Sequence, residues 1–347
     1  MPRVAHLSSA LPALLLGAAL GAQVPQGHGP ADGAANAKVT EWTVPWEKSR
    51  PRDPYLDAKG QVWFVGQVGN YVAKLDPATG KFTKFAIDSG TNPHNLIVDR
   101  QGMIWYAGNR NGMIGKMDPS GKITRYPMPD PAARDPHTLV FDRTQEHIWF
   151  SAQQSGYIGR LATRTGKIDL IKVPGQNTRP YGIVVDSKGT PWVNLFGTNT
   201  IVSVDPTTLA LKSWPLANER TRNRRIAVTP DDQIWYVDYT RGYLGHLDPK
   251  TGKVEEWAAP GGQTSFPYAM GSDHHGRVWF VETGAKPNRL VGFDPRTKKY
   301  FSNTPVGETG GLTVRHMVWD PNANAFWFGT DANTIGRGVV PPPQLVP

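Results

Sequence analysis

Short hydrophobic runs follow one another along the chain, and turns rich in Asp, Gly and Pro separate them. The chain has 37 Gly, 31 Pro and 12 Trp but only 19% charged residues, which is typical of many short strands joined by tight turns. No stretch between the turns has the hydrophobic period of an amphipathic helix. The pattern therefore predicts an all-β protein.

The runs belong to a repeat that is marked by a Trp after an apolar residue or Pro, at spacings of 42, 44, 43, 43, 44 and 48 residues. The repeating residues are Trp63, Trp105, Trp149, Trp192, Trp235, Trp279 and Trp327. Four short strands in each such unit are typical of one blade of a β-propeller. We therefore predict a seven-bladed β-propeller of four-stranded blades, in which each Trp packs between neighbouring blades.

The two ends of the repeat predict how the ring closes. Six Trp units are followed by a fourth hydrophobic run, at 81–87, 122–128, 167–173, 209–216, 253–258 and 298–303. The seventh unit ends near residue 340 without one, and the run 38–44 has the missing pattern. An N-terminal strand that pairs with the last blade would leave no long unpaired edge.

The N-terminal segment predicts export. Residues 1–22 have a positively charged start, a hydrophobic stretch at 11–20 and small residues after it, as in a secretory signal peptide. The stretch is too short for a membrane span, which needs about 20 residues. We expect a monomeric mature protein in the periplasm or secreted, with a flexible tether at 23–37, the propeller at 38–340 and a Pro-rich tail at 341–347.

The amino-acid composition excludes several kinds of functional site. The chain has no Cys, which excludes disulfides, thiolate metal sites and Cys nucleophiles. Its formal charge is +9, but Lys and Arg are scattered singly and form no run typical of a nucleic-acid arm. We expect a small-molecule or anionic substrate and no nucleic-acid partner.

Antiparallel pairing of the first two strands in each blade predicts one polar mouth of the central channel. The positions eleven or twelve residues before each Trp are Arg52, His94, His137, Tyr181, Arg224, Tyr268 and His316. Three acids, Asp238, Glu282 and Asp331, follow the Trp residues of the last three blades. This set predicts a binding pocket, with the alternative that the side chains fill the channel and satisfy one another.

The repeat also carries a family resemblance. Pro-His or Pro-Tyr, Asp-x-x-Gly, an apolar residue before Trp and Ile-Gly-Lys/Arg recur, as in the segment 179–192. Over residues 38–340 this pattern resembles the streptogramin B lyase (virginiamycin B lyase) family. The resemblance implies a propeller that is closed in the same way and a Mg²⁺-assisted elimination that opens the ester of a cyclic depsipeptide.

Carried over by position, the family's base falls on His316 and one of its two acidic metal ligands on Asp331. The second acid is expected two residues before the base, where this chain has Val314, and a substrate-contacting His is replaced by Tyr268. Glu282 and Asp238 are the remaining candidate ligands for Mg²⁺ or another divalent cation. The substrate-binding candidates are Arg52, His94, His137, Tyr181, Arg224 and Tyr268.

Three functions remain open from the sequence. The first is a metal-assisted carbon–oxygen lyase that acts on an ester, a cyclic depsipeptide or a lactone, with His316 as general base. The second is a metal-dependent lactonase-type hydrolase. The third is a non-catalytic propeller that binds an anionic ligand or a partner protein through its Arg- and His-lined face.

Overall fold

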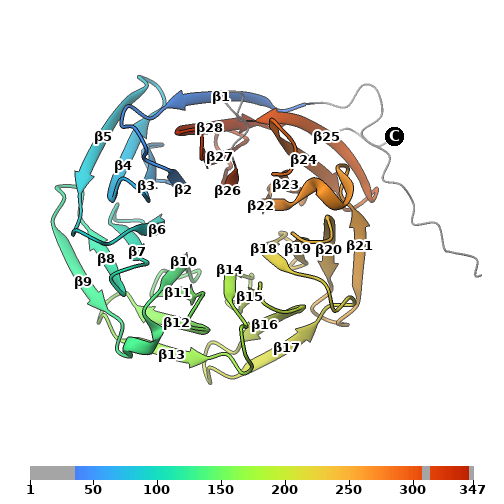
Figure 1. The fold of residues 1–347 in the computed structure, drawn as a ribbon, viewed down its shortest axis with the longest axis horizontal. Helices are drawn as coiled ribbons and strands as arrows, with labels where there is room; N and C mark the ends of the chain where they lie inside the picture. Colours follow the sequence, from blue (N-terminus) through green and yellow to red (C-terminus); the bar gives the residue numbers. More distant parts are fainter. Residues whose placement is uncertain (1–35, 307–312, 344–347) are drawn as a thin grey trace, which may run out of the picture.

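The computed structural model describes residues 36–306 and 313–343, and they form seven four-stranded antiparallel sheets arranged as a ring (Figure 1). The first four blades consist of β2 (Pro51–Leu56), β3 (Val62–Gly66), β4 (Tyr71–Asp76) and β5 (Lys81–Ala86); β6 (Pro93–Val98), β7 (Ile104–Gly108), β8 (Met113–Met117) and β9 (Ile123–Pro127); β10 (Pro136–Phe141), β11 (His147–Ala152), β12 (Tyr157–Ala162) and β13 (Ile168–Lys172); and β14 (Pro180–Val185), β15 (Pro191–Leu195), β16 (Thr200–Val204) and β17 (Leu211–Pro215). The last three consist of β18 (Asn223–Val228), β19 (Ile234–Asp238), β20 (Tyr243–Leu247) and β21 (Val254–Ala258); β22 (Pro267–Ser272), β23 (Val278–Glu282), β24 (Asn288–Asp294) and β25 (Lys299–Val306); and β26 (Val314–Asp320), β27 (Ala325–Thr330), β28 (Thr334–Val339) and β1 (Lys38–Thr43). Two short 3₁₀ helices, η1 (Pro131–Ala133) and η2 (Gly262–Ser265), lie between blades.

The ring closes as the sequence predicts. β1 pairs antiparallel with β28, from Lys38 opposite Val339 to Thr43 opposite Thr334, and becomes the outer strand of the seventh blade (Figure 1). The tether prediction is wrong at its last residue, because Ala37 is buried and its N–H donates to Thr304 Oγ1 at 2.9 Å. The predicted signal peptide and most of the tether lie outside the described residues, so export stays a prediction. No helix in the part of the chain that the structure describes is long and apolar enough to cross a membrane.

The seven repeated Trp residues are all buried, as the spacing predicts. Five of them also donate their indole N–H to the Asp that opens the preceding turn; these are Trp63, Trp105, Trp192, Trp279 and Trp327. In the second blade, for example, Asp99 accepts from the indole at 2.9 Å and from the N–H of Met103 at 2.8 Å. The Asp thus ties the tight turn to the buried Trp, which explains why the two residues recur together.

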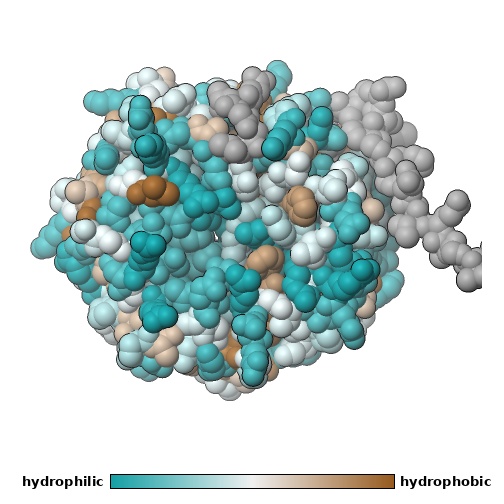
Figure 2. Space-filling model, in the orientation of Figure 1, coloured by the Kyte–Doolittle hydropathy of each residue, from teal (hydrophilic) through white to brown (hydrophobic). Residues whose placement is uncertain are grey.

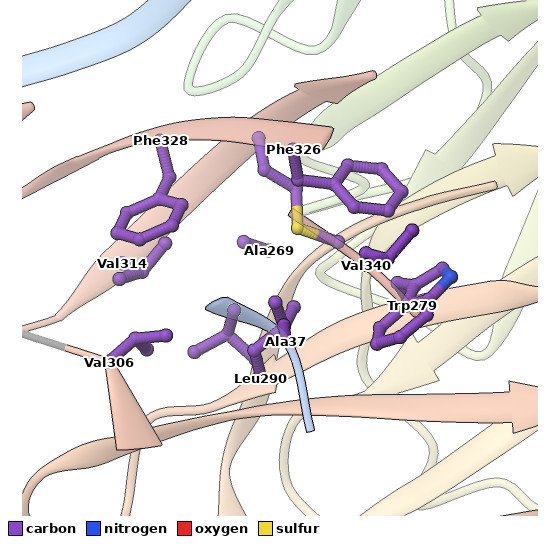
Figure 3. Packing of buried hydrophobic residues seen from close by; sticks show 11 residues of the cluster. Ala37, Ala269, Trp279, Leu290, Val306, Val314, Phe326, Phe328 and Val340 are labelled. Atoms are coloured by element: carbon purple, nitrogen blue, oxygen red, sulfur yellow. The ribbon is translucent and has the colours of Figure 1, made fainter. Parts of the chain in front are cut away.

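Neighbouring blades share apolar clusters. Figure 3 shows the cluster between the sixth and seventh blades, where Trp279 and Leu290 pack with Phe326, Phe328 and the N-terminal Ala37. The Gly on the third strand of most blades makes room for an aromatic ring on the second strand. A Cβ at Gly159 would lie 2.0 Å from Phe150, so a larger residue would displace the ring. The core therefore runs round the whole ring between blades.

Closure generates the first testable prediction. A chain that begins at residue 36 should keep the full thermal stability of a chain that begins at residue 23, since β1 and Ala37 remain. A chain that begins at residue 47 should lose cooperative stability and aggregate, because β28 becomes an exposed edge strand. Thermal unfolding followed by circular dichroism, with light scattering at the same concentration, measures both effects. Equal melting temperatures and equal scattering for the two chains would show that β1 does not hold the ring together.

Candidate functional site at the channel mouth

The innermost strand of each blade starts at the channel mouth, where its first residue pairs with the end of the second strand. Each of these strand pairs shifts register a residue or two further on, so a bulge lies at the mouth in all seven blades. The residues directly after the first position form one layer, which we call the mouth ring. Its members are Arg52, His94, His137, Tyr181, Arg224, Tyr268 and Arg315.

The prediction that His316 is the seventh member of the ring is therefore wrong by one position. Val314 pairs with Thr330 at the start of its strand, so Arg315 takes the ring place and His316 follows it. The turn of this blade is one residue longer than usual, because Trp327 stands seven residues after its Asp and Trp63 stands six. Counting back from Trp327 by the usual interval misses the ring by that residue. The position two residues before Arg315 is Thr313, which is not acidic either.

The other six predicted ring residues do meet at the mouth. The His94 and His137 rings lie 3.5 Å apart between centroids, and His137 lies 4.4 Å from Tyr181. The hydroxyl of Tyr181 hydrogen-bonds that of Tyr268 from the sixth blade. These contacts bear out part of the alternative prediction, since the side chains fill the channel and partly satisfy one another.

Guanidinium groups set the electrostatics of the mouth ring. The pKa of His94 and that of His137 lie well below the ordinary value of an imidazole. Burial is the main cause in both, and the nearby charges of Arg52 and Arg225 add to it. Burial alone would raise the pKa of Tyr181, but Arg224, Arg225 and Arg52 lower it to about 8. The imidazoles are thus neutral donors or acceptors, whereas the Tyr181 phenol loses its proton more readily than an ordinary tyrosine.

Two of these guanidinium groups have buried nitrogen atoms that lack an acceptor. Arg52 donates from Nη1 to Gln67 Oε1 at 2.9 Å, but its buried Nη2 makes no hydrogen bond. Arg224 lies 3.8 Å from the Tyr268 ring centroid and 4.3 Å from that of Tyr239, and its buried Nε makes no hydrogen bond. A buried donor without a partner costs about 1–3 kcal/mol, so an acceptor placed here would bind favourably.

A second layer lies below the ring, and sequence reasoning missed it. Asp53 accepts from Asn95 Nδ2 at 3.0 Å and lies 3.5 Å from Arg225 Nη2 and 3.6 Å from Arg52 Nε. Burial would raise the pKa of Asp53, but the positive groups beside it, Arg52 first, and the hydrogen bond from Asn95 lower it to about 2. Strict alternation would turn such residues away from the channel, whereas the bulge lets two successive residues face inward. The consecutive pair Arg224-Arg225 was the one visible hint of this layer.

The structure does not bring the three predicted metal ligands together. Asp331 pairs with Arg315 Nε at 3.2 Å and Arg50 Nε at 3.4 Å. Asp238 accepts from Arg241 Nη1 at 3.2 Å, and Glu282 accepts from the N–H of Gly261 at 2.7 Å, so each carboxylate is held by a loop of its own surroundings.

The partners of the three acidic side chains determine whether a divalent cation could bind among them. Arg315 and Arg50 outweigh burial and lower the pKa of Asp331, whereas burial raises the pKa of Glu282. Within residues 36–306 and 313–343, no cluster of three His, Asp or Glu side chains could hold a metal ion. The donor set does not fit the Mg²⁺ centre that the resemblance implies, because an Arg already neutralises the acid nearest the channel.

Aromatic side chains border the mouth on the fourth to sixth blades. Phe196, Tyr239 and Phe266 lie in a row, with centroid distances of 6.2 Å and 5.3 Å, and Phe266 is 39% exposed. Arg224 lies 4.8 Å from the Phe196 ring and joins this row to the mouth ring. One face of the disc is hollowed at its centre, and the surface round the hollow is mostly hydrophilic (Figure 2).

The comparisons agree with this fold. The model of the virginiamycin B lyase family matches residues 33–204 and 146–338, so the chain belongs to that family. A streptogramin B lyase structure has a TM-score of 0.79 at 23% identity and covers 88% of this chain and 98% of its own. Selenomethionine-substituted virginiamycin B lyase from Staphylococcus aureus has a TM-score of 0.80 at 20% identity and covers 88% and 100%.

The fold is also shared with hydrazine synthase from Kuenenia stuttgartiensis, with a TM-score of 0.71 at 14% identity and coverage of 85% and 96%. No curated protein sequence matches the chain. At these identities the solved structures support the propeller fold and not a reaction.

The imidazole of His316 generates the second prediction. Burial and Arg225 lower the pKa of His316 to about 4, so the unfolded chain takes up protons below about pH 6.5 while folded His316 does not. The free energy of unfolding should therefore fall as the pH drops from about 6.5 to 4, and His316→Gln should reduce that slope by up to about 1.4 kcal/mol per pH unit. Urea unfolding at each pH measures it. Between pH 7 and 8 the free energy of unfolding should depend on pH in the same way in His316→Gln and in the unsubstituted protein. If the two proteins also have the same pH dependence below pH 6, the lowered pKa of His316 is wrong.

Proposed function

We propose that the channel mouth binds a small organic anion that also carries an aromatic or other flat apolar group. The observation that carries this is Arg224, a cation held among aromatic rings with its buried Nε unpaired. Four guanidinium groups lie in the two layers, whereas Asp53 is the one carboxylate among the described residues of these layers. The four are Arg52, Arg224, Arg225 and Arg315. The excess of positive charge in a partly dry site favours a carboxylate, because arginine pairs with it through two parallel hydrogen bonds.

The aromatic row supports the second half of the proposal. Phe196, Tyr239 and Phe266 offer ring faces and edges beside Arg224, and Phe266 remains exposed. Such a ligand would place its acid on the guanidinium groups and its flat part on this row. This is the small-molecule or anionic partner that the sequence predicts.

Binding at the mouth generates the third prediction. N-acetyltryptophan, which combines an indole and a carboxylate, should bind by isothermal titration calorimetry, and its neutral amide should bind at least tenfold more weakly. Arg224→Gln should weaken the acid at least tenfold, since the variant keeps a polar side chain but loses the charge. Arg220→Gln is the matched control, because Arg220 is exposed outside the mouth ring. Equal affinity of Arg224→Gln and the unsubstituted protein would contradict the proposed site.

A second candidate function, carbon–oxygen bond cleavage by elimination, rests on family membership and on the tyrosine pair. The phenol of Tyr181 meets that of Tyr268 among arginines, and its pKa is lowered to about 8, which suits a general base near neutral pH. As base it would take the proton α to a carbonyl. That C–H electron pair forms a carbon–carbon double bond while the β carbon–oxygen bond breaks, and the leaving oxygen departs as a carboxylate. The nearby guanidinium groups would stabilise the negative charge that develops.

This route assigns no role to a metal, since the acidic side chains are already paired, and it replaces His316 by Tyr181 as the base. A structure of a catalytically inactive virginiamycin B lyase with quinupristin covers 88% of this chain at 20% identity. Quinupristin is therefore the substrate to try first.

The fourth prediction separates the reaction classes. Ring opening of quinupristin by elimination leaves the mass unchanged, whereas a lactonase-type hydrolase adds the mass of one water. If elimination occurs, Tyr181→Phe should lower its rate by about 10²–10⁴-fold. His316→Ala should keep the rate, and a chelator should not change it. Loss of turnover in His316→Ala together with chelator sensitivity would instead support the metal-assisted mechanism that the resemblance implies. Mass spectrometry of the product provides the readout, and no cleavage at all would leave the mouth as a binding site.

A further inference from the structure

The channel contains a separate cavity below the mouth ring. Its volume is about 250 Å³, and residues from all seven innermost strands line it. The wall is mainly apolar, with Val184, Val228, Val318 and Trp319 among its residues. This cavity differs from the mouth in both lining and position.

The mouth ring and the second layer directly below it separate the two spaces. The hydrogen bond between Tyr181 and Tyr268 spans from the fourth blade to the sixth. Arg225 spans from the third blade to the seventh, because Nη1 donates to Thr138 Oγ1 at 3.3 Å and Nε donates to the carbonyl of Arg315 at 3.1 Å. A molecule at the mouth must therefore displace these side chains before it reaches the cavity.

The opposite end of the channel offers a shorter route. Two clefts at the turns between the first and second strands share lining residues with the cavity, and Trp319 lines all three. Val318 lies between the cavity and one cleft, and Ser272 between the cavity and the other. A small molecule can thus approach from the turn side of the disc without passing the mouth ring.

Polar groups gather at the inner end of the cavity. Arg225 is 2% exposed, lines the cavity, and its Nη2 makes no hydrogen bond, although Asp53 Oδ2 lies 3.5 Å away. His316 also lines the cavity, and its Nδ1 makes no hydrogen bond. Among the described residues, no Asp or Glu lines the cavity. One buried cation and one unpartnered imidazole therefore face a mainly apolar space.

We propose that this cavity is a second binding site, which takes a small organic carboxylate with a single ring or a short hydrocarbon body. The carboxylate lies at Arg225 and His316, and the apolar body lies along Val184, Val228 and Val318. The size fits, because an apolar cavity of roughly 150 Å³ already accommodates benzene. The site is independent of the proposed function of the mouth, and it gives His316 a role in binding.

Benzoate is the probe, and two-dimensional NMR of histidine-labelled protein follows the His316 imidazole during titration. Benzoate should shift the His316 signals saturably, and benzyl alcohol, which has the ring without the charge, should bind at least tenfold more weakly. Two variants test the cavity in different ways. Arg225→Gln removes the charge, and Val184→Phe fills the apolar part; each should weaken benzoate at least tenfold, whereas Val68→Phe at an exposed position should not.

Arg224→Gln separates this cavity from the mouth. If benzoate binds in the cavity, this variant keeps its affinity; if benzoate binds at the mouth, the affinity falls with Arg224→Gln and stays with Val184→Phe, which overturns the proposal. Absence of any His316 shift in the unsubstituted protein up to about 10 mM benzoate also overturns it. This last measurement needs no variant, so a substitution that fails to fold leaves the test intact.

Discussion

The pairing of β1 with β28 is the constraint on which the rest of the structure depends. It completes the outer strand of the last blade with the first strand of the chain and closes the ring. Because the ring is closed, the seven innermost strands surround one channel, and the mouth-ring residues lie at one end of it. Large polar side chains are therefore buried in the channel, where they must find partners among one another or in a ligand.

The partners available in the channel are unequal in charge. Asp53 is shared by Arg52 and Arg225, and Asp331 is shared by Arg315 and Arg50. Each carboxylate thus pairs with two arginines, whereas Arg224 has only aromatic rings and a phenol hydroxyl beside it. A further cation would increase this imbalance, and an anion would reduce it. Because of this charge balance we propose an organic acid rather than a metal ion as the ligand of the mouth, although the resemblance to the lyase family implies Mg²⁺.

Most of the fold could be predicted from the sequence, because each repeat specifies its own turn and its own buried Trp. The Asp-to-Trp hydrogen bond is local, and closure follows from one missing strand at one end and one spare strand at the other. The site could be predicted less well, because it depends on single-residue register. One additional residue in the turn before Trp327 moves Arg315 into the ring and His316 into the cavity.

The direction of the side chains is the second feature of the site that could not be predicted from the sequence. Asp238 and Glu282 stand at the predicted strand ends, but their carboxylates pair with Arg241 and with the N–H of Gly261 and not with each other. Those partners come from loops whose conformation the repeat does not encode. The spacing placed the backbone of these residues correctly and could not specify where their carboxylates lie.

The most direct test of the account is an anomalous diffraction map from one crystal soaked in both 4-iodophenylacetate and Mn²⁺. The account predicts iodine density beside the aromatic row of Phe196, Tyr239 and Phe266, with the carboxylate on Arg224, and no manganese peak among Asp331, Glu282 and Asp238. A manganese ion bound by those carboxylates, with no iodine at the mouth, would contradict it.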